Sequence, residues 1–404
     1  MNIRSLTGFL SLSESIQPSD LHAFSDLARA ARDEFTTAGF PVQTTRVATQ
    51  SIADIAPRSL PRFARELEAA CQANEINYVS MGALPGDHVL IEYLAEAIAA
   101  TENVFGAAHI ASREGGINLK AITSSARVIC QLASSTADGF GNLRFAALAN
   151  CPPHSPFFPV AYHDDGSPAF ALATEAAPLA VASFNRAINL DDARANLDDA
   201  RANLVGAVER AGETLAQIAN ALATRFSFRF AGIDFSLAPY PEESRSIGAA
   251  MEKLIGAKFG ERGTLFAAAF LTDCLNRANF PRVGFSGLML PVLEDSMLAA
   301  RSTDYSLDSL LLYSTVCGTG LDTIPLPGDT TSDTIAAILL DLASLAVKLN
   351  KPLTARLMPI PGMQAGDTTR FNFEYFANAR VLDGGTTALK IFGANDKVEF
   401  KTIR

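Results

Sequence analysis

Short strand-like runs alternate with helical patterns along the whole of this chain, and this alternation limits its fold more than any other feature. Ten runs have the apolar, β-branched character of strands. They cover residues 2–12, 42–49, 76–84, 104–112, 143–150, 170–173, 228–237, 283–292, 320–326 and 353–360. Strands that alternate with helices pair side by side in a parallel or mixed sheet. The sequence therefore predicts an α/β fold whose sheet is either open or closed into a barrel, and we expect residues 1–404 to form one domain.

The composition argues against several classes of protein. Hydrophobic residues make up 48% of the chain and charged residues only 19%, which is typical of a globular protein and not of a disordered one. The net charge of −10 argues against a nucleic acid or an anionic membrane as a partner, because both attract positively charged surfaces. The most apolar later stretch, 334–347, contains Asp341 and is too short to cross a bilayer.

The cysteines and the amino end predict a location. Five cysteines are scattered without any CxxC spacing, which fits a reducing compartment better than a disulfide framework. Residues 1–10 have a broken apolar run and lack a small-residue cleavage site. They are typical of a first strand rather than of a signal peptide, so we expect a cytoplasmic protein.

A seven-residue duplication marks the segment 178–226. Leu190-Asp-Asp-Ala-Arg-Ala-Asn is followed directly by a second copy that begins at Leu197, and Leu204 comes next. Leucines seven residues apart share one face of a helix, so the segment predicts a long amphipathic helix, with a break near Asn189. Only about two heptads are present, fewer than a coiled coil needs. We expect part of this helix to pack on a second copy of the chain in a two-fold homodimer.

Acidic residues follow or end several of the predicted strands between 234 and 367. Asp234 lies near the end of the run 228–237, Glu294 and Asp295 follow the run 283–292, and Asp322 lies within the run 320–326. In α/β sheets and barrels, catalytic groups gather at the carboxyl ends of strands, where a carboxylate can act as a general acid or base. Structural roles compete with this interpretation, because an Asp near a Pro favours a turn, and acidic residues in a first helical turn are stabilised by the helix dipole.

Cys317 is the most suggestive thiol of the chain. Gly318 and Gly320 on its carboxyl side let a ligand or a backbone approach closely. A thiolate there would be a nucleophile, but no histidine near it in the sequence marks a base. Free cysteines also pack commonly as small hydrophobic residues, so both a catalytic and a structural role remain open.

His163 is followed by Asp164 in a loop that comes after several prolines. A histidine beside a carboxylate can bind a divalent metal or form an acid–base pair. The glycine patterns GxGxxG and GxxxxGK[ST] are absent from the sequence, so no nucleotide cofactor is expected. The sequence therefore predicts a divalent metal as the only cofactor with any support.

Several motifs together resemble one known family. The segment Ile233-Asp-Phe-Ser-Leu-Ala-Pro, with the later Pro291-Val-Leu-Glu-Asp, Val316-Cys-Gly-Thr-Gly-Leu-Asp and Pro327-Gly-Asp-Thr, is similar to uncharacterised protein family 0210, also called domain of unknown function 711. The likeness reaches back through Arg144-Phe-Ala-Ala-Leu-Ala-Asn to the first strand and covers nearly the whole chain. The family has no established activity.

The resemblance implies a fold. Members of the family resemble pyruvate formate-lyase and anaerobic ribonucleotide reductase, whose fold is a ten-stranded α/β barrel, and ten strands are predicted here. Glycyl radical enzymes of that fold carry an Arg-Val-X-Gly-Tyr loop. In this chain Arg380-Val-Leu-Asp-Gly-Gly is followed by Thr386, so the tyrosine is missing and the glycine is shifted. We therefore expect no radical chemistry, and we expect residues 383–385 to lie away from Cys317.

The first hypothesis for the function is an enzyme that acts on a small polar metabolite by carboxylate acid/base chemistry, most simply a hydrolase. Asp234 or Asp322 would be the base and Glu294 or Asp295 the acid, with Cys317 as a further catalytic candidate.

Substrate binding is assigned to residues of the same strand ends. Arg113 and Arg356 would hold an anionic group, and Ser236, Ser286 and Asp367 would add hydrogen bonds. We expect the strand ends to surround one cavity. The second hypothesis is a ligand-sensing protein whose pocket holds no ionisable group of perturbed pKa.

Overall fold

The computed structural model describes residues 1–164, 166–185, 193–387, 389–390 and 397–400. Its strands form one sheet in the order β8-β7-β1-β2-β3-β4-β6-β10-β9, while β5 pairs with β4 and β11 pairs with β5. The bounds are β1 Asn2–Leu10, β2 Val42–Thr49, β3 Tyr78–Pro85, β4 Val104–Ser112, β5 Gly116–Asn118, β6 Phe145–Ala149, β7 Ala169–Glu175, β8 Arg229–Asp234, β9 Gly320–Pro327, β10 Leu353–Ile360 and β11 Lys397–Val398.

The long strands of the sheet run in two opposite directions. Strands β1, β2, β3, β4 and β6 are parallel to their neighbours in this group. Strands β7 and β8 are parallel to each other and antiparallel to β1, and strands β9 and β10 are parallel to each other and antiparallel to β6. The prediction of a mixed, mainly parallel α/β sheet is confirmed.

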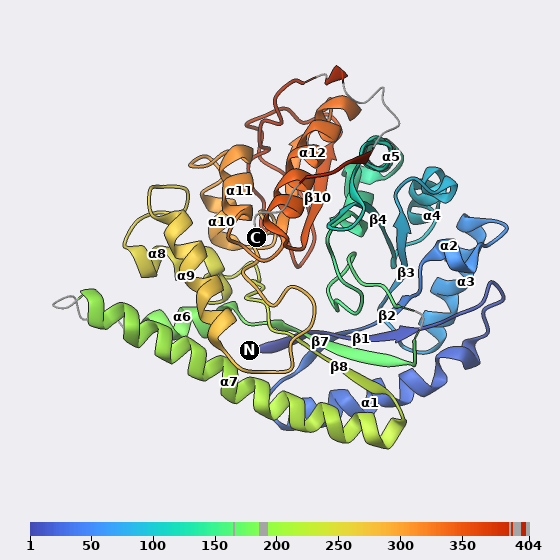
Figure 1. Ribbon diagram of the computed structural model, residues 1–404, viewed down its shortest axis with the longest axis horizontal. Coiled ribbons are helices and arrows are strands. Elements are labelled where there is room, and N and C mark those ends of the chain that lie inside the picture. The colour runs from blue at the N-terminus through green and yellow to red at the C-terminus, as the bar shows by residue number, and fades with distance from the viewer. Residues whose placement is uncertain (165, 186–192, 388, 391–396, 401–404) are drawn as a thin grey trace.

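Helices cover the outer face of this sheet (Figure 1). They are α1 His22–Thr37, α2 Ile52–Ile55, α3 Leu60–Ala73, α4 Leu94–Ala99, α5 Leu119–Ser135, α6 Ala177–Asn185, α7 Ala193–Phe226, α8 Ile247–Ile255, α9 Thr264–Arg277, α10 Ser296–Ala300, α11 Leu307–Ser314 and α12 Ser332–Leu349, with short 3-10 helices at Pro18–Leu21, Val89–Tyr93, Ala137–Arg144 and Glu243–Arg245. Local signals set their ends. The Thr331 hydroxyl caps α12 by accepting from the Thr334 N–H, and Asn350 ends it at a φ of 51°.

The run 283–292, predicted as a regular strand, is instead part of an irregular segment, residues 282–292. Gly284 and Ser286 have φ values of 64° and 42°, which interrupt an extended backbone. The segment makes isolated parallel bridges instead. Two of them join it to the β8 side of the sheet, at Ile233 and Leu237, and one joins Pro291 to Asp322 of β9. The segment therefore lies between the two edge strands β8 and β9.

The inner face of the sheet is occupied by the interior segment, which we define as residues 150–168 apart from 165 (Figure 1). The Ser5 and Thr7 hydroxyls donate to the Pro156 carbonyl, and the Ser80 hydroxyl donates to the Ala161 carbonyl. Small side chains leave room for this segment. They are Ala48, Ala83, Ala107, Ala146, Ala169, Ala171 and Ala173. Alanines on the inward positions of the strands thus allow a loop to be packed there.

Helix α7 runs along one edge of the molecule (Figure 1). Its apolar stripe packs on its own chain, because Leu204 is fully buried and Leu197 is partly buried against the main core. Leu190, the first leucine of the predicted stripe, lies outside the described residues. Burial of Leu197 and Leu204 removes much of the reason for pairing through this stripe, and the homodimer stays a prediction.

Among the described residues, the helices are all too short or too polar to cross a membrane.

The packing of the interior segment gives a first prediction. Phe158 contacts Phe105 with ring centroids 5.2 Å apart, and both rings are buried. Replacing Phe158 by Ala should lower the free energy of unfolding by about 3–5 kcal/mol, because the change leaves a cavity in a packed cluster. Denaturant unfolding measures this loss. The control Phe266→Ala removes a ring that is 51% exposed and should cost about 0.5 kcal/mol. Equal losses would contradict the described packing.

Candidate functional site

A cavity of about 200 Å³ lies on the inner face of the sheet, beside the interior segment. Charged side chains from distant parts of the chain line it together with aromatic rings. The charged residues are Arg4, Arg46, Glu102, Arg144, Glu294, Asp322 and Arg356. The aromatic residues are Tyr78, Phe105, Phe140, Phe157, Phe158, Phe285, Phe373 and Tyr375. An enclosed apolar wall with a few convergent polar groups is the usual form of a small-molecule site.

Two carboxylates share the guanidinium of Arg356. Its Nε donates to Asp322 Oδ1 at 2.5 Å, and its Nη2 donates to Glu294 Oε1 at 2.8 Å. Strands β9 and β10 are neighbours in the sheet, and the Pro291 bridge to Asp322 brings Glu294 to the same place. All three side chains are about nine-tenths buried. Of the strand-end residues predicted to surround one cavity, these three do so.

The ion pairs continue beyond Glu294 into a chain. Arg4 Nη2 donates to Glu294 Oε2 at 2.9 Å, and Arg4 Nη1 lies 3.3 Å from Glu175 Oε2. Glu175 accepts a further hydrogen bond from Arg245 Nε at 2.9 Å. The Arg4 guanidinium also lies 4.8 Å from the centre of the Tyr375 ring. Alternating charges compensate one another, which is the condition under which buried ions are tolerated.

The two carboxylates on Arg356 differ in their proton affinity. Burial opposes the charge of Glu294, but Arg356 and Arg4 outweigh it and hold the pKa of Glu294 below its usual value. Burial raises the pKa of Asp322, and although Arg356 opposes this, the negative charge of Glu294 adds to the rise. Burial would lower the pKa of Arg356, but both carboxylates raise it, so the guanidinium stays charged. Adjacent carboxyls with separated pKa values can divide the roles of acid and base.

Arg46 and Arg144 bring positive charge to the cavity without a carboxylate partner. Within the described chain, neither guanidinium has a carboxylate oxygen within 4.0 Å. Arg46 Nε donates to the Thr44 hydroxyl at 2.9 Å, and Arg144 Nη1 donates to the Thr101 carbonyl at 2.8 Å. Burial lowers the pKa of each arginine to about 10, so both remain charged near neutral pH. Buried guanidinium groups of this kind bind carboxylates and phosphates strongly.

Asp234, Ser236 and Ser286 lie in a separate hydrogen-bond network outside the lining of this cavity. The Asp234 carboxylate accepts from the backbone N–H groups of Phe285 and Ser286, both at 2.7 Å, and from the Ser236 hydroxyl at 2.6 Å. Burial raises the pKa of Asp234 to about 6, against these hydrogen bonds. The network holds the positive-φ turn of the segment 282–292 against β8, so these residues position backbone.

Asp295 also has a structural place. Its Oδ1 accepts from Met297 N–H and Leu298 N–H at the start of α10, and its Oδ2 accepts from Ile247 N–H at the start of α8. One buried carboxylate therefore caps two helices, which is the role that helix N-termini favour for an acidic residue. It does not line the cavity.

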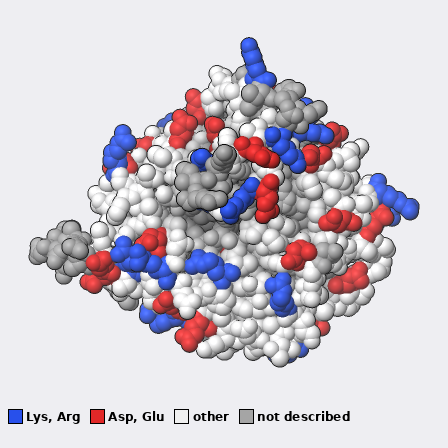
Figure 2. Space-filling model, in the orientation of Figure 1, with Lys and Arg blue, Asp and Glu red and all other residues white. Residues whose placement is uncertain are grey.

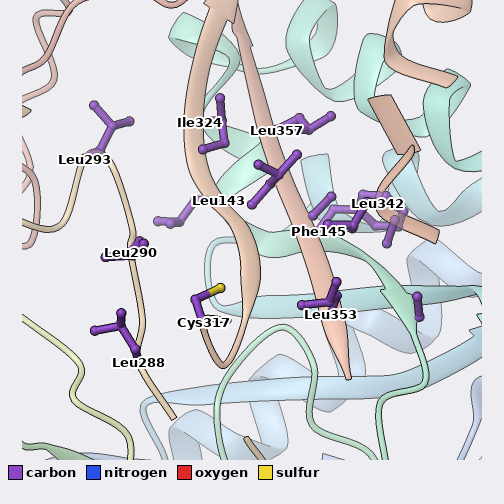
Figure 3. Packing of buried hydrophobic residues seen from close by; sticks show 14 of the residues in the cluster. Leu143, Phe145, Leu288, Leu290, Leu293, Cys317, Ile324, Leu342, Leu353 and Leu357 are labelled. Carbon is purple, nitrogen blue, oxygen red and sulfur yellow. The ribbon is translucent and has the colours of Figure 1, made fainter. Parts of the chain in front are cut away.

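Cys317 lies in the hydrophobic core rather than on the cavity. Figure 3 shows it among buried leucines at the turn before β9, with Leu288 and Leu353 near it. Its side chain is 1% exposed. Residues 383–385 lie at the other end of β9, because the Leu382 N–H donates to the Pro325 carbonyl and Gly384 approaches Leu326. The length of β9 separates this loop from Cys317, as expected, and the position gives radical chemistry no support.

Two predicted substrate-binding residues are exposed and lie away from the cavity. Arg113 follows β4 on the surface, and Asp367 lies in a surface turn where its carboxylate accepts from the Gln364 N–H. The sequence suggested both because they follow strands. However, a polar residue in a turn after a strand is also common at an ordinary surface.

His163 and Asp164 come together with a third residue, His154, at another point of the interior segment. One atom from each lies within 4.8 Å of the others. Burial is the main reason that the pKa of His154 is lowered to about 4, so its ring is neutral near pH 7. The sequence prediction missed His154 because it lies nine residues before His163.

Three of the cavity arginines, Arg4, Arg46 and Arg144, were also missed. Arg4 and Arg46 each interrupt an apolar strand, and Arg144 precedes another. A charged side chain inside a buried strand is costly unless it is paired or faces a polar site. The arginines within these strand-like runs could therefore have been recognised from the sequence as candidate site residues.

The shared guanidinium leads to a prediction about stability. Arg356→Met should lower the free energy of unfolding by about 3–5 kcal/mol at pH 7, because it leaves Asp322 buried without a counter-charge and leaves Glu294 with Arg4 alone. In this variant burial raises the folded-state pKa of Asp322 above the unfolded one. Stability is then gained as the pH falls, and the loss should shrink towards about pH 5.

Denaturant unfolding across this pH range checks the prediction. The matched control is Arg113→Met on the exposed surface, which should change stability by about 0.5 kcal/mol at every pH. A deficit of Arg356→Met that is constant with pH would contradict the buried carboxylate pair.

Comparison with known proteins gives the family. The family model described as "Uncharacterised ACR (DUF711)" matches residues 1–374. A UPF0210 protein of Pyrobaculum aerophilum is 36% identical over an aligned region that covers 71% of this chain. The chain spans 63% of the length of that relative. A UPF0210 protein of Desulforudis audaxviator is 31% identical over 82% of this chain and 77% of its own length. A UPF0210 protein of Pelotomaculum thermopropionicum is 29% identical over 92% of this chain and 88% of its own length. The chain therefore belongs to the DUF711 family, that of the UPF0210 proteins.

Proposed function

We propose that this protein is an enzyme that acts on a small anionic metabolite, most simply as a hydrolase, with Glu294 and Asp322 performing the acid and base chemistry. The observation that carries the proposal is the pair of carboxylates on one buried guanidinium, with pKa values moved in opposite directions. Separated carboxyl pKa values are the arrangement by which known enzymes assign one acid and one base.

The pKa shifts assign the roles in the reverse of the order expected from sequence. Asp322, with its raised pKa, would hold a proton and donate it to a leaving group. Glu294, with its lowered pKa, would stay ionised and activate a water molecule. Arg356 would be a positioning residue, because it contacts both carboxylates and fixes their separation.

Arg46 and Arg144 define the substrate class in this proposal. Two buried guanidinium groups without carboxylate partners favour an anionic group on the substrate, either a carboxylate or a phosphate. The cavity volume of about 200 Å³ suits a small molecule rather than a polymer. On the face shown in Figure 2, positive and negative side chains are interspersed without a broad positive area, which agrees with a partner other than nucleic acid.

The site also supports a proposal about the architecture. We infer that the segment 282–292 closes the sheet into a ten-membered α/β barrel similar to the pyruvate formate-lyase fold. Its bridges to Leu237 on one side and Asp322 on the other support closure. Two groups of parallel strands running in opposite directions support the likeness. The radical chemistry of that fold is not part of the proposal.

A ligand-sensing protein is the second candidate. The observation that favours it is the completeness of the ion-pair chain, in which both Glu294 and Asp322 already have arginine partners. A carboxylate held in this way can serve recognition alone. Turnover distinguishes the two candidates.

Ligand binding is tested first. In a thermal-shift screen of small carboxylates and phosphate monoesters, at least one anion should raise the melting temperature, because a ligand that binds the native state stabilises it. The shift should be lost in Arg46→Met and retained in Arg113→Met, which alters an exposed arginine outside the cavity. A complete lack of shifts, or an equal shift in Arg46→Met, would reject the anion site.

Catalysis is tested with ester, amide and glycoside derivatives of the anion that binds. Asp322→Asn and Glu294→Gln should each lower kcat by roughly 10²–10⁴-fold, the usual contribution of a general acid or base. Binding of the anion itself should change far less, because Arg46 and Arg144 are retained.

The pH dependence of kcat should be bell-shaped. Activity should fall at low pH as Glu294 is protonated, below its usual range because its pKa is lowered. It should fall at higher pH as Asp322 loses its proton, above its usual range because its pKa is raised. Anion binding without turnover of any derivative would favour the sensing protein.

A further inference from the structure

A second cluster of ligand-type side chains lies in the interior segment, apart from the cavity lining. His154 and His163 belong to two stretches that face each other, because the His154 N–H donates to the Tyr162 carbonyl at 3.0 Å. The backbone N–H of His163 donates to the Thr49 carbonyl at the end of β2, at 2.9 Å. The Phe9 and His154 rings pack in a T-shaped arrangement with centroids 4.9 Å apart. Backbone and packing therefore fix both imidazoles, and Asp164 follows directly.

The three ligand atoms form a nearly equilateral triangle. His154 Nε2 lies 3.1 Å from His163 Nδ1 and 3.2 Å from Asp164 Oδ1, and the remaining side, from His163 Nδ1 to Asp164 Oδ1, is 3.4 Å. Zinc bonds of about 2.0–2.2 Å in a tetrahedron separate neighbouring ligand atoms by roughly 3.3–3.5 Å. The triangle is therefore close to one face of a tetrahedral zinc site and slightly smaller than it.

A hydrogen bond outside the triangle directs a lone pair of His163 into it. His163 Nε2 lies 3.1 Å from the Gly166 carbonyl, and a proton donated there leaves a lone pair on Nδ1. His154 Nε2 lies 3.1 Å from that nitrogen and 3.2 Å from Arg229 Nη2. A ring nitrogen has one lone pair, so a zinc ion bound here takes the place of the Arg229 donor on His154. Two ring nitrogens and a carboxylate oxygen thus lie around one point, and without a shared proton or a cation between them they repel one another.

We propose that His154, His163 and Asp164 bind one zinc ion, which ties the two stretches of the interior segment together. Two imidazoles and a carboxylate are borderline ligands that suit zinc better than magnesium or calcium. Asp164 is 46% exposed, so the ion can enter from solution. Three protein ligands leave the fourth position of the ion to water or hydroxide. The site is independent of the proposed catalytic function.

The test uses the full chain freed of metal by chelation and then titrated with zinc or with cobalt as a spectroscopic probe. About one equivalent should bind, the cobalt form should show the intense visible absorption of four-coordinate cobalt, and zinc should raise the melting temperature. Asp164→Asn changes a half-exposed side chain and should fold. It should weaken zinc binding at least roughly tenfold, and His163→Gln should weaken it further.

The control variant is His22→Gln, which alters an exposed histidine on α1 and should bind zinc as the unaltered chain does. His154→Asn keeps a residue type that tolerates the φ of 61° at this position, so a loss of binding there reports on the ligand rather than on backbone strain. The inference is overturned if the unaltered chain and Asp164→Asn bind zinc equally. It is also overturned if the cobalt spectrum is that of a six-coordinate ion.

Discussion

The guanidinium of Arg356 is the contact on which the inner face of this protein depends. It joins β10 to Asp322 on β9 and to Glu294 at the end of the irregular segment 282–292. Through Glu294 it reaches Arg4 on β1, which also lines the cavity. Each charge is tolerated because the next one compensates it, and loss of Arg356 would leave Asp322 buried without a partner. The same chain holds the site together and separates the pKa values of its two carboxylates.

The interior segment is the second constraint, and it depends on small residues. Alanines on the inward positions of the strands make the space, and the Ser5, Thr7 and Ser80 hydroxyls satisfy carbonyls that would otherwise be buried without donors. Once the segment lies inside, its phenylalanines form a wall of the cavity. Its histidines form the proposed zinc cluster elsewhere on the same segment. One loop would therefore connect a catalytic cavity with a metal site, and the metal would limit how far the loop can move.

Several polar residues that resemble catalytic groups in the sequence turn out to organise backbone. Asp295 caps two helices and Asp234 holds a positive-φ turn. In both cases the buried carboxylate accepts hydrogen bonds from backbone N–H groups. Free backbone N–H groups at helix starts and turns attract the same side chains as an active site does. The residue type and its place after a strand are therefore shared by both roles.

The alternation of apolar runs determined the α/β class and nine of the long strands by itself, because strand and helix periods are local properties of the chain. The family motifs and three of the cavity residues, Glu294, Asp322 and Arg356, could also be predicted. Only the tertiary structure decided which carboxylates meet. Glu294 and Arg356 are 62 residues apart and Arg4 and Glu294 are 290 apart, and no local pattern encodes contacts over such separations. It also decided that Cys317 packs among leucines from distant segments, and that the interior segment folds back so that His154 meets His163.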